Sequence, residues 1–129
     1  MSSAFFRIPG NVISKKNSKI ATVIGGVHCP RRPIILPSTA YKKWERQARQ
    51  HFQATYRRHI PITSKCSIRA IFYYKGPQPD LSGCMESIAD CLEGFAWEND
   101  KLIESWDGSR AVHNKLDQYT SLEVTWDGE

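Results

Sequence analysis

Residues 65–75, KCSIRAIFYYK, carry the strongest strand pattern in this sequence. Every second residue from 68 to 74 is apolar, and Ile71 and Tyr73 make the alternate positions partly apolar as well. A strand with apolar side chains in both directions is typical of the middle of a sheet. We therefore expect a central strand that is covered on both faces and ends at GPQP, residues 76–79.

A helix is expected on each side of this strand in the sequence. Residues 38–56 carry apolar side chains at the spacing of one helical face, with Ser38 as the N-cap and Pro61 beyond the end. Residues 81–93 carry a second apolar stripe, and Gly94 ends that helix. The two stripes consist of Tyr41, Trp44, Ala48 and Phe52 in the first helix, and of Leu81, Met85, Ile88 and Leu92, with Cys84 and Cys91 alongside, in the second.

Shorter strands complete the expected fold. They are predicted at residues 5–8, 20–27, 101–106 and 121–126, and residues 31–37 are expected to be extended. This order of elements predicts an α+β fold in a single domain, residues 1–129, with a mixed β-sheet and two main helices. The length of 129 residues and the 40% content of hydrophobic residues are sufficient for one packed core.

Several classes of protein do not fit the composition. No run approaches the ~20 apolar residues of a membrane span, and the N-terminal MSSAFFRIPG lacks the pattern of a secretory signal. The four cysteines, Cys29, Cys66, Cys84 and Cys91, include no CxxC pair, which argues against a structural zinc site. We expect a cytoplasmic protein without membrane association, whose thiols are reduced and partly buried.

The charges are distributed unevenly along the chain. Residues 1–75 contain fifteen of the 18 lysines and arginines and one acid, whereas residues 76–129 contain twelve of the 13 acids. A basic region of this kind is typical of a surface that binds nucleic-acid phosphates. The predicted phosphate contacts are Lys15, Lys16 and Lys19 in a polar loop, Arg46 and Arg49 on the first helix, and Lys75. The alternative is that the two charged halves pair with each other, within the fold or within a dimer of a small structural protein.

The acids of the second half show a regular spacing. Asp80 follows the central strand, and Ser82, Glu86 and Asp90 recur every fourth residue, which puts them on one helical face. Like charges at that spacing repel each other, and a bound cation that offsets the repulsion would explain the pattern. With Asp100 in the following loop, these carboxylates suit Mg²⁺, an ion that takes carboxylate oxygens and promotes phosphodiester hydrolysis. The alternative is an ordinary acidic surface that binds no ion.

Residues 80–103, DLSGCMESIADCLEGFAWENDKLI, resemble the core motif of the RusA family of Holliday junction resolvases, which is common in phages and prophages. That motif reads D-L-D-N-x-x-K-x-x-x-D-x-L-N-G, followed by an aromatic or aliphatic stretch and D-D-x-x-I/V. The opening FRIPG at residues 6–10 and the basic SKKN at residues 14–17 are also similar. The shared positions of the core motif are Asp80, Leu81, Asp90, Leu92, Gly94, Trp97, Asp100 and Ile103.

The resemblance implies a homodimeric endodeoxyribonuclease of mixed α/β build that acts in DNA recombination and repair. It implies that four-way DNA junctions are bound and nicked symmetrically in a reaction that requires Mg²⁺, with Mn²⁺ as an alternative ion. The matching acids Asp80, Asp90 and Asp100 are the implied metal ligands. Glu86 joins them as a fourth catalytic and metal-binding carboxylate, because it restores an acid one helical turn from Ser82.

The motif also contains departures that support a second interpretation. Ser82, Gly83, Glu86 and Asn99 stand where the family motif has Asp, Asn, Lys and Asp. A lysine beside the scissile phosphate stabilises the charge that develops there, and this chain lacks it at that position. The alternative function is therefore a non-catalytic branched-DNA-binding protein on the same fold.

Aromatic residues follow the second helix in the same segment. Phe95 and Trp97 are expected to belong to the core, because large aromatic side chains are more often buried than stacked on a ligand. Trp106 and Tyr73 are the aromatic residues that we consider for stacking on an unpaired base.

Overall fold

The computed structural model describes residues 1–14, 19–26, 29–37 and 39–128 and confirms the predicted α+β fold. Its elements in chain order are β1 (Ser2–Pro9), β2 (Lys19–Gly26), β3 (Cys29–Pro37), α1 (Thr39–Thr55), β4 (Cys66–Tyr74), α2 (Leu81–Cys91), the short 3₁₀ helix η1 (Asp100–Leu102), β5 (Ile103–Ser105), β6 (Arg110–His113) and β7 (Tyr119–Trp126). Within these described ranges, no helix is long and apolar enough to cross a membrane.

A mixed five-stranded sheet has β4 in its middle. The strand order is β1–β7–β4–β5, and β6 also pairs with β4. Strand β7 runs antiparallel to β1 and β4, whereas β5 and β6 run parallel to β4. Cys66 at the start of β4 accordingly pairs with Trp126 on one side and with Ile103 on the other. The central position predicted for residues 65–75 is confirmed.

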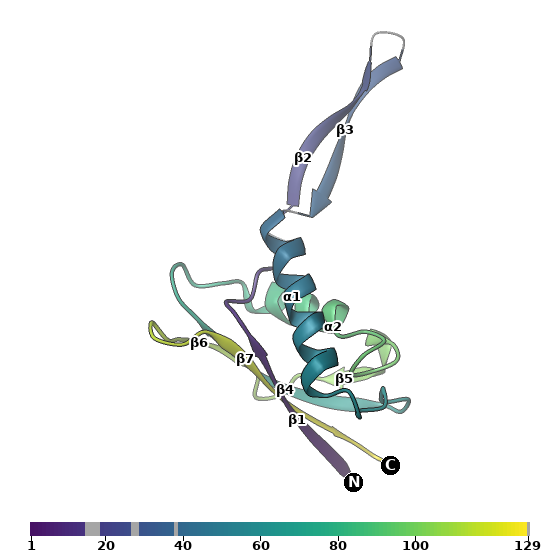
Figure 1. The fold of residues 1–129 in the computed structure, drawn as a ribbon, viewed down its shortest axis with the longest axis vertical. Helices are drawn as coiled ribbons and strands as arrows, with labels where there is room; N and C mark the ends of the chain where they lie inside the picture. Colours follow the sequence, from purple (N-terminus) through teal and green to yellow (C-terminus); the bar gives the residue numbers. More distant parts are fainter. Residues whose placement is uncertain (15–18, 27–28, 38, 129) are drawn as a thin grey trace.

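The expectation that this central strand is covered on both faces is wrong. The buried residues of β4 are Cys66, Ile68, Ala70, Phe72 and Tyr74. On its other face Arg69 is exposed, and Tyr73 is half-buried and stacks on Tyr119 with ring centroids 4.6 Å apart. Helices α1 and α2 both pack against the buried face, as Figure 1 shows. The apolar residues of the second face are therefore covered by neighbouring side chains rather than by a helix.

The face that α2 buries also differs from the predicted stripe. Cys84 and Cys91 are fully buried, whereas Met85 of the predicted stripe is half-buried. Small residues bring the helix close to its neighbours, and a Cβ added at Gly83 would collide with the hydroxyl of Ser14. A search for large apolar residues misses this face, because its closest contacts are made by small side chains.

Strands β2 and β3 form a separate antiparallel ribbon. In Figure 1 this ribbon extends away from the five-stranded sheet, beyond the N-terminal end of α1. The strand predicted at residues 20–27 is thus confirmed, and the extended segment predicted at residues 31–37 lies in its partner strand.

Two features of the C-terminal part were not predicted. Residues 101–106 begin in η1, so that only Ile103–Ser105 is a strand. Strand β6, Arg110–His113, was missed altogether. It is only four residues long, and it is specified by its pairing with Ile71–Tyr74 of β4 rather than by a pattern of its own.

The described thiols are buried and free, as expected for a reduced protein. Cys66, Cys84 and Cys91 form no disulfide. Burial raises the pKa of the Cys84 thiol to about 11 and that of the Cys91 thiol to about 12. Burial also raises the pKa of Cys66. These groups are therefore uncharged, unreactive thiols at neutral pH.

Candidate active site

An acidic pocket lies where the later turns of α2 meet η1 and β5. Glu86 and Asp90 line it from α2, and Asp100 lines it from η1. The remaining wall residues are Ala89, Ile103 and Trp106. The pocket has a volume of about 320 Å³. The structure thus brings together three of the four carboxylates that the sequence predicts as metal ligands.

Three carboxylates in this region are close enough to share one cation. Oxygen atoms of Asp90, Glu93 and Asp100 lie within 4.8 Å of one another. All three residues are half-buried, so their repulsion is screened less than it is between fully exposed groups. Asp90 and Glu93 also lie at the C-terminal end of α2, where the helix dipole disfavours negative charge. A set of hard oxygen donors fits Mg²⁺ or Mn²⁺.

Glu93 is the member of this group that the sequence prediction missed. Its Oε1 accepts a hydrogen bond of 3.0 Å from the backbone N–H of Asp100, which ties η1 to the end of α2. Helical spacing gives no signal for it, because α2 ends at Cys91 and Glu93 lies in the turn that follows. The four-residue pattern that starts at Ser82 skips this position.

The loop that presents Asp100 is held by Asn99, one of the departures from the family motif. The Asn99 side chain accepts a hydrogen bond of 2.9 Å from the backbone N–H of Lys101 and caps η1. An asparagine performs this capping function as well as an aspartate does. Replacement of the motif acid therefore leaves the local backbone intact.

Asp80 lies at the opposite end of α2. It is the N-cap residue, it is exposed, and its Oδ2 accepts a hydrogen bond of 3.1 Å from Ser82 Oγ. The axial distance from Leu81 to Asp90 is about 14 Å, at a rise of about 1.5 Å per residue. The structure does not bring Asp80 into the acidic pocket, and its part in metal binding stays a prediction.

The predicted phosphate contacts have different surroundings. Arg46 and Lys75 are exposed and free to meet a ligand from solvent. Arg49 is held within the fold, because its guanidinium lies 3.2 Å from the Glu45 carboxylate and its Nε donates to a backbone carbonyl in α2 at 2.9 Å. The remaining predicted contacts fall outside the described residues: Lys15, Lys16 and the side chain of Lys19.

The aromatic residues near the pocket divide into two kinds. Trp97 is fully buried, and its indole N–H donates to the Ala89 carbonyl at 3.0 Å, so its prediction as a core residue is confirmed. Phe95 is half-buried and packs against the edge of the core, so its prediction as a core residue is confirmed in part and one side of its ring stays exposed. Trp106 is half-buried and contributes to the wall of the acidic pocket.

A protein-family model matches a region of the chain that includes both the sheet and the acidic residues. The family model for the endodeoxyribonuclease RusA matches residues 9–124. The chain has no significant sequence match among the curated proteins. The family match includes every carboxylate described above and most of the five-stranded sheet. Because it extends over nearly the whole chain, this protein belongs to the RusA family of endodeoxyribonucleases.

Proposed function

We propose that this protein is a metal-dependent endonuclease that resolves four-way DNA junctions by phosphodiester hydrolysis. Membership of the RusA family supports the reaction class and the junction substrate. The observation that carries the proposal is the approach of Asp90, Glu93 and Asp100 to within 4.8 Å of one another. A cation held among carboxylates this close relieves their mutual repulsion, and at the negative end of a helix it also meets a favourable dipole.

The residues of the pocket have separate tasks in this proposal. Asp90, Glu93 and Asp100 would hold the ion, and Glu86, in the same pocket, would accept a hydrogen bond from the attacking water. A divalent ion bound there would supply a water of lowered pKa and neutralise charge on the phosphate. Trp106 limits the access of bulk water along one wall. Asp80 keeps the catalytic role that the family motif implies, but we assign to it no share in the ion held at Asp90.

The exposed cations position the DNA in this proposal. Arg46 and Lys75 contact phosphates, which fixes the position of the junction without reading its sequence. A homodimer presents two equivalent sites, and this symmetry matches a junction with two equivalent scissile strands. The ion is Mg²⁺, with Mn²⁺ able to replace it.

Cleavage of a labelled synthetic four-way junction tests the proposal. The wild-type protein should nick the junction symmetrically in Mg²⁺ and in Mn²⁺ and leave a linear duplex of the same sequence intact. Binding is scored in the same reactions by native gel electrophoresis. Tight binding without nicks under both ions would contradict the nuclease and support the non-catalytic branched-DNA-binding protein.

A pair of variants then tests the pocket itself. Asp90→Asn should lower the rate of nicking by about 100-fold or more, while junction binding is retained. Glu98→Gln removes an exposed acid that does not line the pocket and should nick at the wild-type rate. Nicking by Asp90→Asn at the wild-type rate would exclude this pocket as the active site.

A further inference from the structure

Two adjoining hollows follow the outer face of α1, and we call them together the α1 groove. The first is cationic, is lined by Lys42, Arg46 and Arg49 among others, and has a volume of about 420 Å³. The second is aromatic, contains Tyr56 in its wall, and has a volume of about 290 Å³. Gln53 and Phe95 line both hollows, so the two hollows adjoin at these side chains. Phe95 is therefore placed where a cationic track meets an aromatic pocket.

The charge of the first hollow is positive. Lys42 and Arg46 are exposed and lie four residues apart, which places them on the same side of α1. Glu45, the acid that lines this hollow, is engaged by Arg49 at 3.2 Å and by the Tyr41 hydroxyl at 2.8 Å. The acid thus offsets the inner arginine, and the two outer cations face solvent. A strand of phosphates complements this arrangement.

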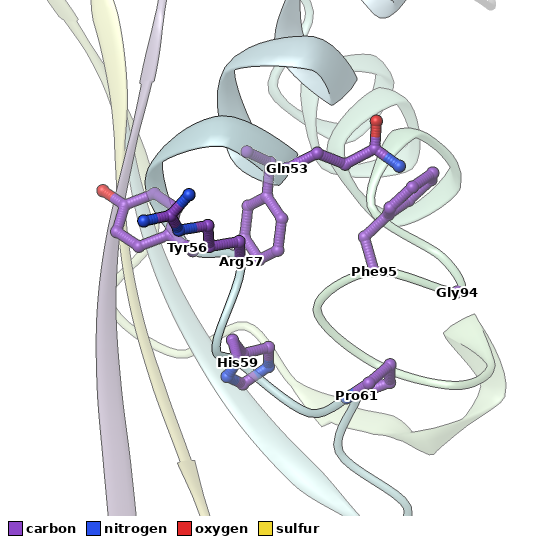
Figure 2. A pocket seen from close by; sticks show the side chains of 8 residues that line it. Gln53, Tyr56, Arg57, His59, Pro61, Gly94 and Phe95 are labelled. Carbon is purple, nitrogen blue, oxygen red and sulfur yellow. The ribbon is translucent and has the colours of Figure 1, made fainter.

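The second hollow has walls that are already fixed by packing. Phe52 is buried, and its ring centroid lies 5.1 Å from that of Tyr56 and 6.0 Å from that of His59. The His59 ring also lies within hydrogen-bond distance, 2.9 Å, of a backbone carbonyl. Figure 2 shows Gln53 and Phe95 along one side of the hollow, with His59 and Pro61 across from them. A flat ring that enters meets aromatic and apolar side chains, and the polar groups around it belong to Gln53, Arg57 and His59.

We propose that the α1 groove holds a DNA strand beside the branch point of the junction. Phosphates lie along Lys42 and Arg46, and one unpaired base enters the aromatic hollow and stacks on Phe95. A cationic groove that leads to aromatic rings is the arrangement by which proteins hold single strands, since every base has a face that stacks. The Gln53 amide supplies donors and an acceptor for the edge of that base. A base within a duplex is stacked on both sides and has no face available.

The groove adjoins the proposed active site through Arg49. Its guanidinium carbon lies 5.8 Å from the Phe95 ring centroid, and its Nε bonds to the carbonyl of Cys91, the residue after Asp90. A strand in the groove is thus next to the turn of α2 that carries the acidic group. This inference rests on the proposed function for the identity of the substrate, but its tests use binding alone.

The first test separates base stacking from charge. Phe95→Leu keeps an apolar side chain on the core but removes the aromatic face. Its affinity for a labelled oligothymidine single strand should fall by about tenfold, with an unchanged dependence on salt. Its affinity for a linear duplex should equal that of the wild type. Fluorescence anisotropy gives both affinities, and thermal unfolding confirms that the variant is folded. Equal single-strand affinity in a folded variant would overturn the stacking site.

The second test addresses the phosphate track. The double variant Lys42→Ala, Arg46→Ala should reduce the slope of log affinity against log salt by about 1.4 for the single strand, about 0.7 for each lost contact. The matched control is Lys43→Ala, Arg58→Ala, which removes two exposed cations that line neither hollow. An equal loss of slope in the control would mean that binding is diffuse, and it would overturn the groove.

These outcomes are distinguishable from failure of the proposed function. If the wild type nicks junctions while both groove variants bind the single strand like the wild type, only the groove is wrong. If the wild type binds the single strand through Phe95 but nicks no junction under either ion, the groove stands and the nuclease is wrong.

Discussion

The two ends of α2 carry acids in opposite electrostatic surroundings. Asp80 at the N-terminal end is a single exposed carboxylate with a hydroxyl partner, placed where the helix dipole favours negative charge. At the C-terminal end, Asp90 and Glu93 meet Asp100, all three half-buried and placed where the dipole is unfavourable. The comparison teaches that an acid at the start of a helix is stabilised by the helix itself, whereas the helix gives no such stabilisation to the three acids at its end.

Two buried thiols, one near each end of α2, have different charges around them. Burial is the main reason for the raised pKa of both Cys84 and Cys91. Asp80 adds to the effect at Cys84, whereas at Cys91 the nearby Arg49 opposes it and the acids Glu45 and Asp90 add to it. Arg49 therefore offsets part of the negative charge at the C-terminal end, where it also binds the backbone carbonyl of Cys91.

The largest expected contrast between the two ends concerns ion binding. Asp90→Asn should lower the affinity for Mg²⁺ by about 100-fold, because it removes one of three charges from the acidic group. Asp80→Asn should leave that affinity unchanged and still reduce nicking, by about tenfold. Titration calorimetry with Mg²⁺ gives the affinities. A loss of Mg²⁺ affinity in Asp80→Asn equal to that in Asp90→Asn would mean that both ends serve one ion.

A smaller effect is expected at Glu93. Glu93→Gln keeps an oxygen that accepts the hydrogen bond from the Asp100 backbone but removes the charge, and it should weaken Mg²⁺ binding by about tenfold. Glu93→Ala also removes the hydrogen bond. If the alanine variant binds Mg²⁺ as weakly as the glutamine variant, charge alone accounts for the contribution of Glu93. A glutamine variant with wild-type affinity would exclude Glu93 as a ligand.

The buried thiols predict how stability depends on alkaline pH. Their folded-state pKa values, about 11 for Cys84 and about 12 for Cys91, exceed the ordinary value of 9.0 for a thiol. A raised pKa means that the unfolded chain releases these protons first, so stability is fully present below about pH 9 and is lost as the pH rises above it. Each thiol should reduce the free energy of unfolding by about 1 kcal/mol between pH 9 and pH 10.

Urea unfolding at several pH values measures this loss. Cys91→Ala should flatten the alkaline slope, although it lowers stability at neutral pH by opening a small cavity. An alkaline slope equal to that of the wild type in this variant would show that other groups cause it.

The smallest expected effect is on the free energy of unfolding, and it has opposite signs at the two ends of α2. In EDTA, Asp90→Asn should raise the free energy of unfolding by about 0.5 kcal/mol, because it relieves repulsion at the negative end of the helix dipole. Asp80→Asn should lower it by a similar amount, because a negative charge at the positive end is lost. In Mg²⁺ the Asp90→Asn variant should instead have a lower free energy of unfolding than the wild type. The reason is that a bound ion stabilises only a chain that retains its ligands. If both variants change the free energy of unfolding in the same direction in EDTA, the two ends of α2 do not differ electrostatically as described.

Much of the fold is readable in the sequence because its long elements have strong patterns. The alternation around Phe72 predicted the central strand, and the apolar face of residues 38–56 predicted α1. The cover of β4 was predicted wrongly, because apolar residues such as Ile71 are also accommodated on a half-covered face by neighbouring side chains. Strand β6 was missed because four residues carry too little pattern.

Part of the candidate site was predictable because some of its residues also follow a regular pattern in the sequence. The regular spacing of Glu86 and Asp90, with Asp100 in the following loop, is visible in the sequence, and the structure places all three around one pocket. The addition of Glu93 and the separation of Asp80 were not visible. Glu93 joins the group because η1 folds back onto the end of α2, whereas Asp80 is separated from it by the length of that helix.

The sequence by itself determined the order of the longer strands and helices, the division of charge and the acidic motif, because these are properties of neighbouring residues. Only the tertiary structure decided which acids meet. The Glu93 carboxylate meets the backbone of Asp100 because the loop after α2 turns at Gly94, whose φ of +85° is readily adopted only by glycine. Asp80 is left at the other end because a helix is a rigid spacer.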